Sequence, residues 1–175
     1  MTNANDSWLT RFLGTDATST GLFLQRLVLG LVILPHGLQK LVGWFGGYGF
    51  DGTMGFFTGT LGLPWLVGLL VILGESVGAL LLVTGLGTRL AAFGMTAIMA
   101  GAVLTTHLQH GFFMNWFGAQ QGEGFEFHLL ALALSIPLTL WGGGRWALDT
   151  TLARTSSAGA RSPREASLPA PSARA

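Results

Sequence analysis

Four long apolar stretches, separated by polar or glycine-rich segments, dominate the pattern of this chain. Each has about the 20 residues that a helix needs to cross the ~30 Å hydrocarbon core of a bilayer. Helices are the expected form, because lipid offers no partner to free backbone groups. We predict membrane-spanning helices over residues of about 21–44, 64–84, 88–109 and 125–141. Pro35 and Pro137 should kink the first and fourth helices without ending them.

The composition agrees with a membrane protein. Of the 175 residues, 50% are hydrophobic. Only 10% are charged, against roughly 25% in an average soluble domain. The absence of cysteine excludes disulfides, thiol redox chemistry and cysteine-ligated metals. No basic stripe is present to bind nucleic acid, and no histidine pair has a spacing that indicates a metal or haem. The predicted partner is therefore the lipid bilayer.

Lysine and arginine are unequally distributed between the two sides that four spans create. Residues 45–63 and 110–124, which form the loops of one side, contain neither residue. The side that holds both termini and the 85–89 turn carries seven arginines: Arg11, Arg89, Arg145, Arg154, Arg161, Arg164 and Arg174. Because cytoplasmic loops are enriched in these residues, we predict that both termini, including an N-terminal segment over residues 1–20, are cytoplasmic. The first helix lacks the features of a cleavable signal and should stay in the mature protein.

The loops and the C-terminus complete the predicted fold. The outer loops are rich in glycine and aromatic residues, which is typical of an aromatic belt at the headgroups. Their length also suits a lid over a cavity between the helices. Residues 150–175 are rich in Ala, Ser, Pro and Arg and are predicted to form a disordered cytoplasmic tail. The predicted fold class is all-α: an integral membrane four-helix bundle with Gly/aromatic-rich outer loops and this disordered tail.

Ionisable residues inside the predicted spans are costly in hydrocarbon and are therefore functional candidates. At ~100° per residue, Lys40 falls at about −40° and His36 at about −80° from Arg26, so the three share one face of the first helix. That face should point into the bundle. Glu75 lies roughly 16 Å below the outer end of the second helix, where the long side chain of Arg26 can reach it. We predict an intramembrane Arg26–Glu75 ion pair.

A second polar group is expected near the outer face. Its members are His36, Lys40, His107, Glu126 and His128, which we predict to form a ligand or proton site. Three of them (His36, Lys40 and Glu126) should bound a pocket whose roof includes Trp44 and Phe57. The alternative is that these side chains only hold the helices together through hydrogen bonds.

The same residues carry a family resemblance. The run LQRLVLGLVILPHGLQKLVGWFGGYG resembles the first helix and loop of the DoxX family of small four-helix bacterial membrane proteins. GESVGALLLVTGLGTR is similar to that family's second helix and turn, and GFEFHLLALAL to its fourth helix. The resemblance covers residues 21–149, which we interpret as one DoxX-like domain. It places these residues on recurrent family positions: Arg26, His36, Gly37, Lys40, Gly74, Glu75, Arg89 and Glu126.

The resemblance implies a location in the bacterial inner membrane and a redox association. Some relatives are linked to quinone-dependent sulfur oxidation or to oxidative-stress complexes, although relatives that use thiols need cysteines, which this chain lacks. The first functional hypothesis is a redox-associated accessory subunit that binds a quinone-like or small aromatic molecule and works with a redox partner subunit. One alternative is a transport module for a small solute or proton, which at four helices would need to form a homo-oligomer. The other is a structural or assembly subunit. The sequence does not decide whether the protein is an enzyme.

Overall fold

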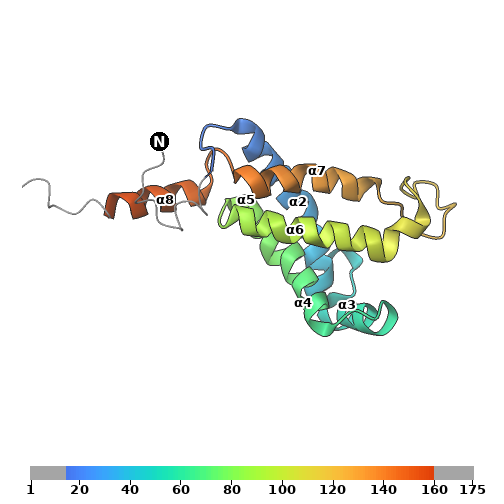
Figure 1. Ribbon diagram of the computed structural model, residues 1–175. Helices are drawn as coiled ribbons and strands as arrows, with labels where there is room; N and C mark the ends of the chain where they lie inside the picture. Colours follow the sequence, from blue (N-terminus) through green and yellow to red (C-terminus); the bar gives the residue numbers. More distant parts are fainter. Residues whose placement is uncertain (1–14, 160–175) are drawn as a thin grey trace, which may run out of the picture.

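The computed structural model describes residues 15–159. Every regular element within them is helical, and they contain no strand. Two pairs of helices make up the fold (Figure 1). The four long elements are α2 (Thr20–Val42), the continuous helix Trp65–Thr84, the helix Thr88–His110, and α7 (Glu126–Trp141). The predicted ranges differ from these bounds by at most two residues. Both α2 and α7 continue through their internal prolines, as expected.

Three of these helices are long and apolar enough to cross a membrane, and α7 is a shorter apolar helix. The second and third are each divided by a π-helical turn. The second consists of α4 (Trp65–Leu73), η3 (Gly74–Gly78) and α5 (Ala79–Thr84). The third consists of α6 (Thr88–Ala102), η4 (Val103–His107) and the 3-10 turn η5 (Leu108–His110). The apolar periodicity predicts continuous helices and does not reveal these turns, which often occur at functional positions.

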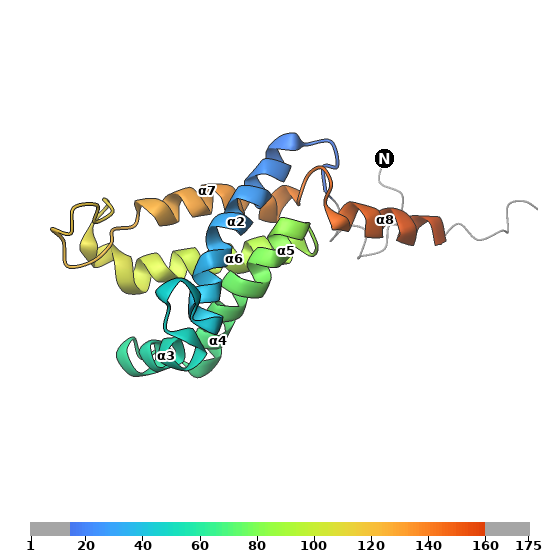
Figure 2. The same ribbon diagram turned by 180° about the vertical axis from the view of Figure 1, so that it is seen from behind.

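The pair α6 and α7 runs antiparallel, and α2 with α4–α5 crosses it (Figures 1 and 2). The core between the pairs is apolar and small-residue-rich, with Ile33, Ala79, Ala92, Met95 and Leu138 almost fully buried. Leucine, valine and phenylalanine side chains of the same helices are exposed on the outside. This arrangement fits a bundle whose solvent is lipid.

The loop after α2 is partly helical. It contains the short turn η1 (Trp44–Gly46), then α3 (Gly49–Gly55), which continues into the π-helical turn η2 (Phe56–Thr60). Figure 1 shows α3 beside α4, at the end of the bundle opposite α8. Met54 and Phe57 bury their side chains against Ile72 of α4 and form a small second core. This end of the bundle therefore has packed walls rather than a free loop.

The predicted disorder of residues 150–175 is wrong for its first ten residues. Leu148–Gly159 form helix α8, which projects from the bundle (Figure 2). Its first turn is fixed, because the Asp149 carboxylate accepts hydrogen bonds from the backbone N–H groups of Gly87 (2.7 Å) and Thr88 (2.9 Å) at the start of α6. A fixed first turn removes the cost of helix nucleation. The remaining predictions for the tail and for the N-terminal segment concern residues 160–175 and 1–14. These residues lie outside the described part of the chain.

At Gly37, the backbone of α2 lies directly against the backbone of the second helix, with no side chain between the two. A Cβ atom at this position would lie 2.2 Å from the carbonyl oxygen of Glu75 and 2.5 Å from the backbone nitrogen of Ser76. Glycine is therefore required by the close approach of two backbones. The contact lies at the π-turn η3 and fixes the position of Glu75 relative to α2.

We expect Gly37→Ala to lower the free energy of unfolding by about 1–3 kcal/mol or more, because neither backbone can move without opening the core. The matched control is Gly101→Ala in α6, where a Cβ atom meets nothing within 4 Å. That control should be neutral or stabilising by about 0.5–1 kcal/mol, as alanine is the better helix former. Thermal unfolding of the purified variants in detergent measures both. Equal stability of the two variants would contradict the close backbone contact.

Candidate functional site

Three groups of ionisable side chains lie at different places in the bundle. Arg26 lies at the α8 end of the bundle. Lys40 and Glu75 meet at the opposite end of α2. His107 and His128 meet where α6 ends and α7 begins. The sequence predicted that these residues form one inward face of the first helix and one outer cluster. The structure separates the members of both groups.

The predicted Arg26–Glu75 pair is wrong. Arg26 is 1% exposed, and its guanidinium donates to the carbonyl oxygens of Leu82 (3.0 Å) and Val83 (2.6 Å). It also donates to those of Gly143 (2.9 Å) and Arg145 (3.2 Å). The last carbonyls of a helix lack intrahelical partners, and the C-terminal end of the helix dipole favours a cation. Leu82 lies seven residues beyond Glu75, or ~10 Å along the helix, so Arg26 binds the end of α5 instead.

Glu75 forms its ion pair with Lys40. The Nζ atom of Lys40 contacts Oε2 of Glu75. Lys40 comes from the last turn of α2, and Glu75 from η3 directly beside the Gly37 contact. The side chain of Glu75 is 8% exposed and that of Lys40 is 26% exposed. The carboxylate is thus almost fully enclosed, while the ammonium reaches a surface.

That surface is the wall of a cavity of about 750 Å³ between the end of α2 and the α3–η2 segment. The wall carries three aromatic rings and several glycines, and its polar side chains are Gln39, Lys40, Thr53, Thr60 and, through its hydroxyl, Tyr48. Phe57 lines the cavity as predicted, whereas Trp44, His36 and Glu126 do not. The pocket predicted to be bounded by His36, Lys40 and Glu126 is therefore wrong as a group: of these three residues only Lys40 borders this cavity.

His36 is exposed on α2, and its ring centroid lies 6.2 Å from that of Phe127 in α7. Glu126 belongs to the first turn of α7 and accepts hydrogen bonds from the backbone N–H of Met114 (3.1 Å) and from Nε1 of Trp116 (3.3 Å). The carboxylate of Glu126 therefore holds the loop before α7. The structure does not bring Glu126 to the cavity because its side chain is directed to its own loop.

His107 and His128 form the third polar place. Their ring centroids are 4.1 Å apart, and Nδ1 of His107 donates to the carbonyl oxygen of Glu123 (2.8 Å). Nδ1 of His128 is buried and has no hydrogen-bond partner within the described part of the chain. Within residues 15–159 no group of three or more His, Asp or Glu residues could hold a metal ion. These histidines connect η4, α7 and the loop between them.

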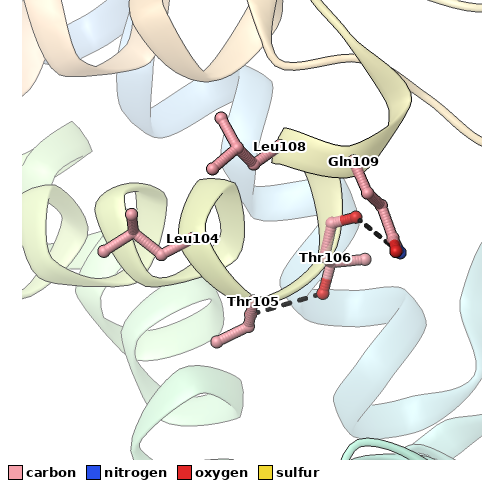
Figure 3. Close-up of a pocket in the computed structure, with 5 residues that line it drawn as sticks. All are labelled: Leu104, Thr105, Thr106, Leu108 and Gln109. Carbon is pink, nitrogen blue, oxygen red and sulfur yellow. Dashed lines mark hydrogen bonds between the residues drawn. The ribbon is translucent and has the colours of Figure 1, made fainter.

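A smaller cavity of about 270 Å³ lies on the outer side of η4 and η5. Figure 3 shows its lining residues: Leu104, Thr105, Thr106, Leu108 and Gln109. The polar groups already bond to one another, since Gln109 Nε2 donates to the Thr106 carbonyl (3.3 Å). This cavity has no charged residue and no aromatic ring. The larger cavity beside Lys40 is the better candidate for a ligand site.

Sequence reasoning missed the wall that α3 and η2 contribute. Tyr48, Thr53 and Phe56 were interpreted only as parts of an outer loop, yet all three line the cavity. The signal for it was the apolar pair Met54 and Phe57, whose spacing of three residues places them on one helical face.

Comparison with known proteins identifies the family of the chain. The model of the DoxX family matches residues 21–108. A protein of Bacillus subtilis (strain 168) named "Putative oxidoreductase CatD" is 33% identical over 129 residues, which cover 74% of this chain and 84% of that protein. No solved structure matches the chain. The family match includes both partners of the Lys40–Glu75 pair and the whole α3–η2 wall.

Proposed function

Because the chain belongs to the DoxX family, we propose that this membrane protein binds a quinone-like aromatic molecule in the cavity beside Lys40 and acts as a redox-associated accessory protein. The observation that carries the proposal is the Lys40–Glu75 pair at an aromatic-lined cavity. The relative named as an oxidoreductase supports the redox association. Quinone reduction takes two electrons and two protons. The proposal assigns ligand binding to this chain and electron delivery to a partner protein.

The size and chemistry of the cavity support this ligand class. A volume of about 750 Å³ falls within the roughly 300–1,000 Å³ of small-molecule sites. Tyr48, Phe56 and Phe57 offer ring surfaces, and the glycines allow a planar molecule to approach the backbone. The ammonium of Lys40 has three N–H donors, of which Glu75 takes one. The other donors can bind a carbonyl oxygen of the ligand.

Equilibrium binding of duroquinone to the protein in lipid nanodiscs tests the proposal. Wild-type protein should bind it, and the double variant Lys40→Met/Glu75→Gln should bind at least about tenfold more weakly, since losing a hydrogen bond to a charged donor costs about 1.5–3 kcal/mol. Removing both charges avoids a stranded buried ion. The control Gln109→Ala alters only the smaller cavity and should bind normally. No binding by wild-type protein, or equal binding by the double variant, would refute the site.

We also propose that the cavity faces the outer leaflet of the bacterial inner membrane. The support is the distribution of Lys and Arg, which are absent from residues 45–63 and 110–124. A reporter that is active only in the cytoplasm should therefore work when fused after Ala175 and fail when inserted into residues 45–63. Activity of the loop fusion with silence of the C-terminal fusion would reverse the orientation.

A further inference from the structure

We propose that the cavity distinguishes the two redox states of its ligand and binds the dicarbonyl form, a quinone, more tightly than the dihydroxy form, a hydroquinone. This inference rests on the proposed function, because it concerns the same cavity. It adds a direction: the protein should hold the oxidised molecule and release the reduced one.

The distribution of charge around the cavity supports this selectivity. Lys40 is the only charged residue among the eleven that line the cavity. Its counter-ion Glu75 is 6% exposed and does not line the cavity, since the carboxylate lies behind the ammonium in contact with it. The ligand therefore meets the cation directly and the anion only through Lys40. The pair as a whole is neutral, so the cavity offers no net attraction to an anionic ligand.

The hydrogen-bonding chemistry of the two redox states then differs. An ammonium donates hydrogen bonds and cannot accept one. Each carbonyl oxygen of a quinone only accepts, so it suits the remaining N–H donors of Lys40. A hydroquinone hydroxyl also carries a proton that needs an acceptor. The buried Glu75 carboxylate is not on the wall, which leaves neutral acceptors such as the side-chain oxygens of Gln39, Thr53 and Thr60.

These neutral acceptors bind less strongly than a charged group, because hydrogen bonds with one ionised partner are roughly twice as strong as neutral ones. We therefore expect duroquinone to bind about tenfold more tightly than durohydroquinone. By linkage, tenfold preference for the oxidised form lowers the two-electron reduction potential of the bound couple by about 30 mV.

The experiment measures the dissociation constants of duroquinone and durohydroquinone for the protein in nanodiscs, without oxygen, with empty nanodiscs to correct for partition into lipid. Wild-type protein should show a ratio of about ten. In Lys40→Gln/Glu75→Gln, where an amide can both donate and accept, the ratio should fall to about one. Gln109→Ala should keep the wild-type ratio, because it lies outside the cavity.

The outcomes separate the two proposals. If neither molecule binds to wild-type protein, the proposed function fails and this inference fails with it. If both bind with equal affinity, the quinone site stands and the redox selectivity is refuted. If the double variant keeps a ratio near ten, Lys40 does not set the selectivity and the inference is overturned.

Discussion

Replacing Arg26 with leucine is expected to lower the free energy of unfolding by about 4 kcal/mol or more, the largest effect of any single substitution considered for this fold. The guanidinium satisfies four carbonyl oxygens, at distances of 2.6 to 3.2 Å, from α5 and from the segment after α7. Leucine would remove the side-chain donor from the carbonyl oxygens of Val83, Gly143 and Arg145 in a site where Arg26 is 1% exposed, whereas the Leu82 oxygen keeps the backbone N–H of Gly85 (3.2 Å). Each buried polar group without a partner costs about 1–3 kcal/mol.

Two further variants make this test specific. Arg26→Lys retains the charge, but an ammonium cannot donate in several directions from a planar group. Its free energy of unfolding should therefore lie between those of wild type and Arg26→Leu. Arg145→Leu removes an exposed guanidinium that stacks over the Trp146 ring, at a cost of less than about 1 kcal/mol. Chemical unfolding in detergent micelles measures all three. A loss for Arg26→Leu no larger than that for Arg145→Leu would show that the carbonyl contacts do not stabilise the bundle.

Glu75→Ala is expected to lower the free energy of unfolding by about 3–5 kcal/mol, because it leaves the Lys40 ammonium without its counter-ion in a largely buried position. The double variant Lys40→Met/Glu75→Ala should recover much of this loss, since no charge then remains to be stabilised. The same unfolding measurement on the two single variants and the double variant gives the coupling energy. Additive losses would mean that the two side chains do not interact, whatever their distance in the fold.

Most of the fold could be predicted from the apolar pattern. The three long helices and the shorter α7 begin and end close to the predicted residues, because the apolar stretches that a bilayer requires set their extent. Helix α8 could not be predicted in this way, since the contact of Asp149 with the start of α6 joins residues more than sixty positions apart. Its composition alone favours disorder.

The candidate site was predicted only in part. The helical-wheel argument correctly marked Arg26 and Lys40 as buried or half-buried polar positions, and the depth argument did so for Glu75, but the partner predicted for Glu75 is wrong. The depth of a residue along its own helix does not show which residue of a neighbouring helix lies beside it. The crossing is set by Gly37 against η3, and a π-turn has no pattern in the apolar positions. His36 shares a predicted face with Lys40 yet is exposed, whereas Gly37 packs directly against the second helix and Lys40 contacts Glu75 there.

The residues predicted to form one outer polar group lie apart in the fold, because they belong to helices that cross at different places. His107, Glu126 and His128 lie at the junction of η4 and α7, where His107 and Glu126 bond to the loop and the His128 ring packs against that of His107. Lys40 lies across the bundle at the α3–η2 wall. Residues at one predicted depth can thus belong to different helix pairs, and the crossing of those pairs becomes visible only in the fold (Figure 1).

Lys40 is the only lysine of the chain, so its chemical labelling can show directly whether it borders a ligand cavity. Acetylation of the protein in nanodiscs by an amine-reactive ester, followed by mass spectrometry of the Lys40 peptide, gives the labelling rate with and without saturating duroquinone. The N-terminal amine serves as the internal reference. We expect Lys40 to be labelled in the free protein, and we expect duroquinone to slow its labelling several-fold while the reference rate stays constant. An unlabelled Lys40 in the free protein, or a rate unchanged by duroquinone, would contradict this expectation.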